Sequence, residues 1–331
     1  MKAILSIAVG GPETLTLGEL PIPPLGAGQV RVAVKACSVN YPDLLVIQDL
    51  YQFKPPRPFA PGSDVAGIVA SVGDGVRTVR VGDRVLAACG MGGMTEQVVV
   101  AEHACIGIPE TLPFDVAAAL LTTYGTSQYA LQQRARLARG ETLLVLGAAG
   151  GVGLAAVELG KAIGARVVAG ASSAAKIAVA MEHGADEGVV YPAGALDRIQ
   201  AKALADQFKS ACGVNGADVI YDPVGGDYTE PALRAIAWDG RLLVVGFPAG
   251  IPRIPLNLPL LKSCQIVGVF WGAAAARDPA LFRSQLAELL GMYTRGAIRP
   301  LVSERFPLER AGEAIACLAG RQAIGKIVVV P

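Results

Sequence analysis

The sequence carries little charge and no marked excess of either sign. Charged residues make up 17% of its 331 residues, and the formal net charge is +1. It also has no block of like charges, no low-complexity tail and no internal repeat. A nearly neutral chain offers no electrostatic reason to expect nucleic acid, a membrane surface or a strongly acidic partner. We therefore expect a small, nearly neutral ligand.

The sequence also lacks the patterns of metal clusters, disulfide frameworks and histidine-based catalytic sites. Its six cysteines are scattered without any C-x-x-C pair, and it has only two histidines, His103 and His183. Scattered cysteines in apolar surroundings are typical of buried free thiols. No Ser-His-Asp or His-Cys arrangement is indicated.

Long hydrophobic runs and a targeting segment are missing as well. The uncharged stretches 116–133 and 142–157 are broken by Thr, Ser, Gln or Gly, which argues against a membrane span. The apolar start is short and soon reaches Gly10-Gly11-Pro12, unlike a secretion signal. These features predict a cytoplasmic protein with no membrane partner.

The chain shows two successive patterns of predicted secondary structure, and its length is typical of two domains. Short β-rich runs separated by Gly and Pro predict a β-rich domain, at residues 15–17, 29–36, 66–72, 84–88 and 95–100. From about residue 115, helical segments alternate with apolar runs at 142–146, 166–169, 187–190, 219–221, 241–245 and 265–269. That alternation predicts a doubly wound parallel sheet, and so an α/β protein. A helix at 279–294 and a closing strand at 326–330 suggest a return to the first domain.

A glycine-rich turn gives the clearest functional signal. Residues 147–153 read Gly-Ala-Ala-Gly-Gly-Val-Gly between a predicted strand and a predicted helix. Such a turn lets the backbone approach a pyrophosphate, whose charge meets unpaired N–H groups at the helix N-terminus. The next strand, 165–169, is not followed by the Asp or Glu that typically holds the ribose of NAD. Hydroxyls and a cation follow instead, at Ser172, Ser173 and Lys176, and suit a 2′-phosphate, so we expect NADPH.

Several motifs in sequence order resemble the medium-chain dehydrogenase/reductases, and among them the zinc-free quinone oxidoreductases that include the zeta-crystallins. The resemblance covers essentially the whole chain and is carried by 40–43 (Asn-Tyr-Pro-Asp), 61–67 (Pro-Gly-Ser-Asp-Val-Ala-Gly), 81–85 (Val-Gly-Asp-Arg-Val), 147–153, Gly246-Phe247 and Gly325-Lys326. It implies a GroES-like catalytic domain and a Rossmann domain for NADPH. The implied boundaries are 1–121 for the first part of the catalytic domain, 122–257 for the Rossmann domain, and 258–331 for its sixth strand and the return. It also implies a homodimer.

The family divides over zinc. Zinc-dependent members hold a Cys, a His-Glu pair and a further Cys at the places that here are Asn40, Ser63-Asp64 and Thr122. Without thiolate and imidazole ligands a stable zinc site is not expected. The predicted reaction therefore runs without a Lewis acid, which suits a conjugated acceptor whose enolate can be stabilised by hydrogen bonds.

Two residues are catalytic candidates by resemblance. Tyr51 lies as far after Asn40 as the catalytic Tyr of enoyl thioester reductases lies after its Asn-x-x-Asp pattern, and a phenol can donate a proton. The alternative is a Tyr that only lines the substrate cleft. Asn40 is a candidate to bind the nicotinamide ribose or the substrate carbonyl, with a local turn cap as the alternative.

The resemblance also assigns cofactor contacts. Lys176, Tyr191 and Arg321 match positions around the 2′-phosphate, and Thr126 matches a cofactor-side Thr or, alternatively, a helix-start residue. Phe247 and Phe270-Trp271-Gly272 follow the fifth and sixth strands and are expected to flank the nicotinamide, with core packing or a dimer edge as the alternative. The predicted cofactor set is Thr126, Ala149, Gly150, Gly151, Val152, Ser172, Ser173, Lys176, Tyr191, Phe247, Phe270, Trp271, Gly272 and Arg321.

The sequence thus predicts a metal-free, NADPH-dependent reductase for a quinone or an α,β-unsaturated carbonyl. An enoyl thioester reductase is an alternative, although no basic groove for CoA phosphates is evident. A second alternative is a crystallin-like protein that binds NADPH, or RNA, with little catalysis; the near-zero net charge disfavours RNA.

Overall fold

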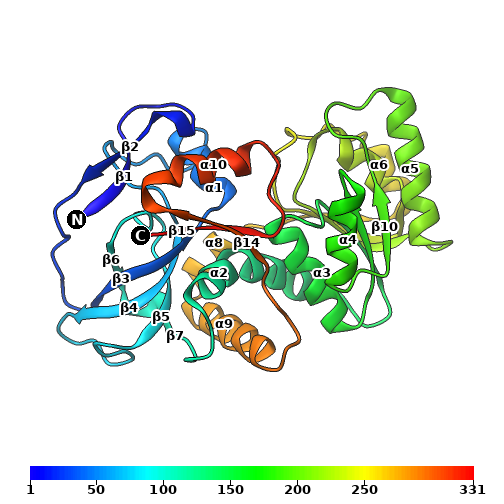
Figure 1. The fold of residues 1–331 in the computed structure, drawn as a ribbon. Coiled ribbons are helices and arrows are strands. Elements are labelled where there is room, and N and C mark those ends of the chain that lie inside the picture. Colours follow the sequence, from blue (N-terminus) through cyan, green and yellow to red (C-terminus); the bar gives the residue numbers. More distant parts are fainter. The chain divides into compact units, whose positions relative to one another are not determined.

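The computed structural model describes the whole chain, residues 1–331, and its internal contacts divide it into two units. The first unit is Met1–Thr122 with Pro300–Pro331, and the second is Thr123–Arg299. Figure 1 shows the N-terminal (blue) and C-terminal (red) segments together in the first unit. The predicted α/β architecture, a β-rich domain and a parallel-sheet domain, is confirmed.

The first unit is built on a mainly antiparallel sheet of order β14-β15-β3-β4-β5-β7, with β6 paired to β3 and a separate β1-β2 pair. Its strands are β1 (Lys2–Ser6), β2 (Leu15–Glu19), β3 (Gln29–Ser38), β4 (Asp64–Val72), β5 (Arg84–Ala88), β6 (Gln97–Ala101), β7 (Cys105–Gly107), β14 (Val302–Pro307) and β15 (Lys326–Val330). Its helices are α1 (Tyr41–Ile47) and α10 (Ala311–Ala319), and α2 (Phe114–Gln128) runs across the boundary between the units.

Alternation of buried and less buried residues along β3 explains why this sheet keeps one face on a core. Val30, Val32 and Val34 are buried, while their neighbours are partly or fully exposed. The strand runs two residues further than predicted, to Ser38, where β15 pairs with it. This pairing joins segments that are almost three hundred residues apart and brings the start of β15 to the end of β3.

The second unit is a parallel sheet of order β10-β9-β8-β11-β12-β13. Its strands are β8 (Thr142–Leu146), β9 (Arg166–Ala171), β10 (Glu187–Val190), β11 (Ala217–Asp222), β12 (Ile236–Val244) and β13 (Gln265–Gly268). Its helices are α3 (Gly151–Ile163), α4 (Ala174–Glu182), α5 (Arg198–Cys212), α6 (Thr229–Leu233), α7 (Asn257–Lys262), α8 (Trp271–Arg277) and α9 (Pro279–Thr294).

The order of these strands fixes where a ligand belongs. The central strands β8, β9 and β11 are apolar runs buried on both faces, as expected for a parallel sheet covered by helices. The chain begins at β8, proceeds to β9 and β10, and then crosses to β11 on the other side of β8. Ligands bind beyond the carboxyl ends of the strands at such a reversal, so the end of β8 is the expected position.

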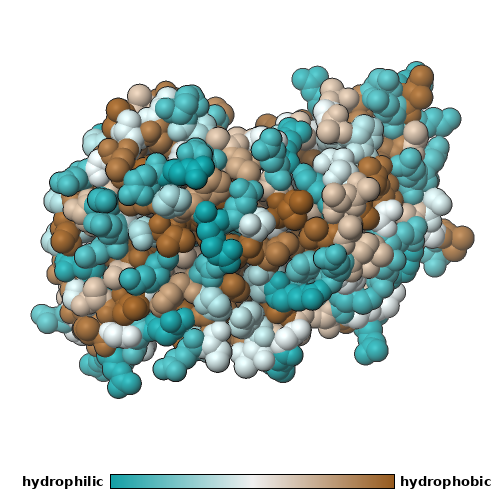
Figure 2. All heavy atoms as spheres, viewed as in Figure 1, coloured by the Kyte–Doolittle hydropathy of each residue, from teal (hydrophilic) through white to brown (hydrophobic).

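The surface is mixed in character. Figure 2 shows hydrophilic and hydrophobic residues intermixed over the visible face. No helix is both long enough and apolar enough to cross a lipid bilayer.

Candidate functional site

The glycine turn lies where β8 ends and α3 begins. Gly147 has φ of 59°, a left-handed conformation that favours glycine, and Gly150 N donates to its carbonyl oxygen at 2.9 Å. At Gly153 a Cβ would lie only 2.1 Å from that same oxygen, so glycine alone fits. The helix starts inside the turn, at Gly151, and its first N–H groups have no partner within the helix. These features fit the pyrophosphate of a dinucleotide.

Two polar side chains, from Ser127 and Tyr191, form hydrogen bonds with the backbone of this turn. Ser127 donates to the carbonyl oxygen of Val152 at 2.8 Å. Tyr191 is buried, and its hydroxyl accepts a hydrogen bond from Gly147 N at 3.1 Å. Its ring packs against that of Tyr228, with centroids 4.9 Å apart. Tyr191 therefore supports the turn, whereas its expected contact with a 2′-phosphate stays a prediction.

The loop after β9 contains the residues predicted to hold that phosphate. Ser173 is the N-cap of α4, and its Oγ accepts from Lys176 N at 3.3 Å. Ser172, Ser173 and Lys176 are all partly exposed, and no carboxylate lies among residues 171–177. Burial lowers the pKa of Lys176. Arg321 follows α10 and belongs to the first unit.

The predicted nicotinamide-side residues differ in exposure. Phe247 follows β12 and Phe270 follows β13, and they are 42% and 55% exposed, at the carboxyl ends of their strands. Trp271 is buried, because it opens α8 and its indole packs against Phe282 at 5.9 Å between ring centroids. Its Nε1 donates to Gln285 Oε1 at 3.3 Å. This packing favours a core role for Trp271 over a cofactor contact.

Two further cofactor candidates lie on helices. Gly272 is exposed in the first turn of α8. Thr126 is not at a helix start, the alternative considered for it, because α2 begins at Phe114 and Thr126 lies near its end. The helix starts earlier than that alternative assumed, since residues 114–128 form one continuous run of helix-compatible residues. The cofactor role of Thr126 remains a prediction.

In the first unit, Asn40 is the centre of a buried polar network. Lys326, at the start of β15, donates from Nζ to the Asn40 side-chain oxygen Oδ1 at 2.7 Å and to the Val39 carbonyl oxygen at 2.5 Å. The Asn40 amide nitrogen Nδ2 donates to Asp64 Oδ1 at 2.5 Å and to Ser38 Oγ at 3.0 Å. Burial lowers the pKa of Lys326, and the charge of Asp64 opposes that shift.

The alternative predicted for Asn40, a local cap, agrees with the structure, because Asn40 is the N-cap of α1. Its N–H donates to Asp43 Oδ2 at 2.7 Å, and Asp43 N donates to the Asn40 carbonyl oxygen at 3.0 Å. Asp43 Oδ1 accepts from Gly62 N at 3.0 Å. Burial raises the pKa of Asp43 to about 7, against the lowering effect of the Asn40 and Gly62 N–H groups. Asn40 is 4% exposed, so little of its amide is open to a ligand.

Tyr51 follows α1 and packs partly buried against the core of the first unit. Burial and, to a smaller degree, the charge of Asp43 raise the pKa of its phenol above 10. The phenol is therefore protonated at neutral pH and can donate a hydrogen bond or a proton. Asn40, Asp43 and Tyr51 thus belong to one region of the first unit.

The places that hold zinc ligands in zinc-dependent relatives do not suit a metal here. The Asn40 side-chain oxygen is bound to a buried ammonium, whose positive charge would repel a metal ion. Ser63 donates to Asp64 Oδ1 at 3.2 Å, and Thr122 N donates to Asp64 Oδ2 at 3.2 Å, so that carboxylate already has its partners. The residues at these places therefore form a hydrogen-bonded network with its own cation.

Sequence reasoning missed the part that Lys326 plays. The motif Gly325-Lys326 was visible, but a single lysine before an apolar strand usually indicates a solvated strand end. The one available signal was the four apolar residues that follow Lys326 in β15, which predict a buried strand.

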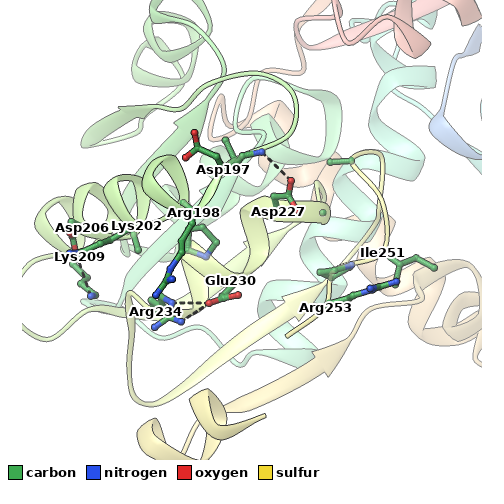
Figure 3. Close-up of a pocket in the computed structure, with 17 residues that line it drawn as sticks. Asp197, Arg198, Lys202, Asp206, Lys209, Asp227, Glu230, Arg234, Ile251 and Arg253 are labelled. Atoms are coloured by element: carbon green, nitrogen blue, oxygen red, sulfur yellow. Dashed lines mark hydrogen bonds and ion pairs between the residues drawn. The ribbon is translucent and has the colours of Figure 1, made fainter. Parts of the chain in front are cut away.

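The second unit also has a groove of about 810 Å³ between α5, α6 and the loop after β12. Figure 3 shows the residues that line it. Its walls carry charges that pair within the groove; Arg234, for example, contacts Glu230. None of the predicted site residues lines it. The groove is therefore separate from the glycine turn.

Comparison with known proteins identifies the family of the chain. Residues 26–110 match the family of alcohol dehydrogenase GroES-like domains, and residues 151–290 match the zinc-binding dehydrogenase family. A quinone oxidoreductase-like protein 2 homolog of Nematostella vectensis is 39% identical over 92% of this chain and 82% of its own length. The chain belongs to the zinc-free quinone oxidoreductase family of medium-chain dehydrogenase/reductases.

Solved structures are similar to this chain over its whole length. A mycobacterial protein in complex with NADPH is 29% identical to it, with a TM-score of 0.92 over 100% of both chains. The Escherichia coli quinone oxidoreductase in complex with NADPH is 26% identical to it, with a TM-score of 0.90 over 100% of both chains.

Proposed function

We propose that the protein is an NADPH-dependent, metal-free reductase of a quinone or an α,β-unsaturated carbonyl. The main support for this proposal is the glycine turn at the end of β8, where the strand order reverses. The first N–H groups of α3 have no partner within the helix there, and no carboxylate follows β9. The NADPH complexes of two similar structures support the choice of cofactor. When bound, NADPH supplies a hydride to the acceptor.

The residues of the chain have four tasks in this reaction. The N–H groups of 151–153 bind the pyrophosphate, and Ser172, Ser173 and Lys176 bind the 2′-phosphate. Phe247 and Phe270 shield the nicotinamide from water. Tyr51 supplies the proton: its O–H bond breaks as a bond to the reduced acceptor forms, and water returns a proton to the phenolate.

Turnover with a panel of acceptors tests this proposal. We expect oxidation of NADPH with 1,4-benzoquinone and with a simple enone, at saturating cofactor, and slow turnover of crotonyl-CoA. Tyr51→Phe should lower kcat for the enone by about a hundredfold or more and leave the Kd of NADPH unchanged. Tyr293→Phe, in α9 of the other unit, is the control.

The outcomes separate the alternatives. Fast turnover of crotonyl-CoA alone would indicate an enoyl thioester reductase. Tight binding of NADPH without turnover of any acceptor would indicate a binding or structural role. A Tyr51→Phe variant with full kcat would show that Tyr51 only lines the site.

We further propose a homodimer formed at β13. This strand is one of the two edges of the parallel sheet, and an edge strand can pair with another chain. Large apolar side chains near it are exposed: Leu260 by 76%, Leu261 by 62% and Ile266 by 42%. A dimer mass by light scattering that becomes a monomer mass in Ile266→Lys would support this, and a monomeric wild type would refute it. The six unpaired cysteines accord with the cytoplasmic location that we propose.

A further inference from the structure

Lys326 is a buried ammonium in a family member that has no zinc ligands at the corresponding places. The residue is 6% exposed and begins β15. Lysine is rarely buried to this degree unless its charge is compensated. Its Nζ donates to the Val39 carbonyl and to Asn40 Oδ1, so neither direct partner is charged. The charge is compensated one step further away, at Asp64 and to a smaller degree at Asp43.

Asn40 links the two charges and has only one favourable orientation. Its Oδ1 faces the ammonium of Lys326, and its Nδ2 faces the carboxylate of Asp64. If the amide flipped, an NH₂ group would face the ammonium and an oxygen would face the carboxylate. Both contacts would be repulsive in a buried site, where charges are screened weakly. Lys326 and Asp64 together therefore fix the amide.

The network ends at the hydroxyl of Ser63, a residue that is partly exposed to solvent. Ser63 accepts from Asn40 Nδ2 at 3.3 Å and donates to Asp64 Oδ1 at 3.2 Å. Ser63 is partly exposed, whereas Asn40, Asp64 and Lys326 are buried. The orientation of Asn40 thus sets that of the Ser63 hydroxyl.

We propose that Lys326 is a positioning residue of the reduction. Lys326 fixes the Asn40 amide and, through it, Ser63, and it supplies the one buried cation on the side where the acceptor binds. This rests on the proposed function. Negative charge develops on the acceptor oxygen as hydride arrives, and a nearby positive charge held in a fixed place stabilises it. An ammonium on β15 thereby stands in the region where zinc-dependent relatives hold their metal.

Lys326→Met removes the charge and keeps an unbranched chain of similar length. We expect kcat to fall about tenfold to a hundredfold, as for residues that orient catalytic groups, while the Kd of NADPH changes less than about twofold. Lys35→Met, at an exposed position of β3, is the matched control. Lys326→Arg, which keeps the charge, should recover part of the loss.

A second variant distinguishes a purely structural role of Lys326 from a role in positioning Asn40. Lys326→Met leaves Asp64 buried without a cation, so it should also lower stability. Lys326→Met with Asp64→Asn removes that charge and should recover part of the stability, because the asparagine oxygen can accept only some of the hydrogen bonds that the two Asp64 oxygens accept from Asn40, Ser63 and Thr122. The proposal expects kcat to remain low in this double variant, with Asp64→Asn alone as the reference. If the double variant regains wild-type kcat together with stability, Lys326 serves only to balance charge and the proposal is overturned.

A spectroscopic readout does not depend on turnover. The Asn40 side-chain amide, identified by its loss in Asn40→Ala, should shift in the ¹⁵N–¹H spectrum of Lys326→Met and of the double variant, but not of Lys35→Met. An unchanged resonance would overturn the proposal even if the acceptor chemistry is right. A shifted resonance in a protein without turnover would support the positioning of Asn40 while the proposed function fails.

Discussion

Gly153→Ala is the substitution for which the structure gives the clearest expected effect. An alanine Cβ would lie 2.1 Å from the Gly147 carbonyl oxygen and 2.8 Å from its carbonyl carbon. Side-chain Cβ atoms essentially never approach closer than 3.0 Å, so the turn and α3 must separate by roughly 0.9 Å. Both contacted atoms are backbone, and the turn is tied by the bond from Gly150 N to Gly147 O. No flexible side chain can absorb the movement.

Two opposing effects determine how much Gly153→Ala changes the free energy of unfolding. Replacing glycine by alanine inside a helix gains up to about 1 kcal/mol. Overpacking costs about 1–3 kcal/mol, and more where the backbone must move. We expect a net loss of about 1–2 kcal/mol in the free energy of unfolding of the second unit. The same shift displaces the N–H groups of the first helical turn, so the Kd of NADPH should rise about tenfold or more, or at least about 1.4 kcal/mol.

Urea denaturation of the full chain without cofactor measures the first effect, and fluorescence titration with NADPH measures the second. Gly291→Ala is the matched control, because this glycine lies within α9 and its Cβ would meet only the flexible end of Arg295, at 3.1 Å. It should stabilise by about 0.5–1 kcal/mol. If Gly153→Ala stabilised the protein as much as Gly291→Ala and bound NADPH normally, the close approach at the turn would be refuted.

Three further predictions concern pH, a buried hydrogen bond and the cofactor. Burial raises the pKa of Asp43 to about 7, so the folded state favours its protonated form. The contribution of Asp43 to the free energy of unfolding is therefore fully present below about pH 4 and is lost as the pH rises to about 7. The free energies of unfolding measured at pH 4 and at pH 8 should differ through this group by at most about 4 kcal/mol. Tyr124→Phe removes the hydroxyl that donates to buried Glu158 Oε2 at 2.8 Å and should cost about 1–3 kcal/mol in unfolding free energy. Lys176→Ala should raise the Kd of NADPH about tenfold to a hundredfold and leave that of NADH nearly unchanged, by titration with each.

Each of these has a control and a result that would contradict it. Asp43→Asn cannot titrate, so its stability should vary less between the two pH values; an equal variation would assign the effect to other groups. Tyr129→Phe removes a phenol outside this network, and a loss as large as that of Tyr124→Phe would mean that the buried bond is not the cause. Equal weakening of NADPH and NADH in Lys176→Ala would place Lys176 away from the 2′-phosphate.

Much of the second unit could be predicted from the sequence because its signals are local. The strand at 142–146 and the helix at 279–294 agree with β8 and α9 of this unit. In the first unit, the closing strand at 326–330 agrees with β15. Strand, glycine turn and helix follow one another within about twenty residues, and the missing acid after β9 is a composition signal. Periodicity and glycine chemistry act over such distances without help from the rest of the chain.

Tertiary structure alone decided the direction of single side chains. The position of Trp271 after the sixth strand was predicted correctly, but the short helix α8 was not, and that helix turns the indole into the core. Asn40 and Lys326 are 286 residues apart, and their contact exists because β15 pairs with the end of β3. The sequence by itself therefore determined the fold and the expected cofactor, through short-range patterns. Only long-range strand pairing determined which cation lies beside Asn40, because a buried charge takes its partner from whatever the sheet brings next to it.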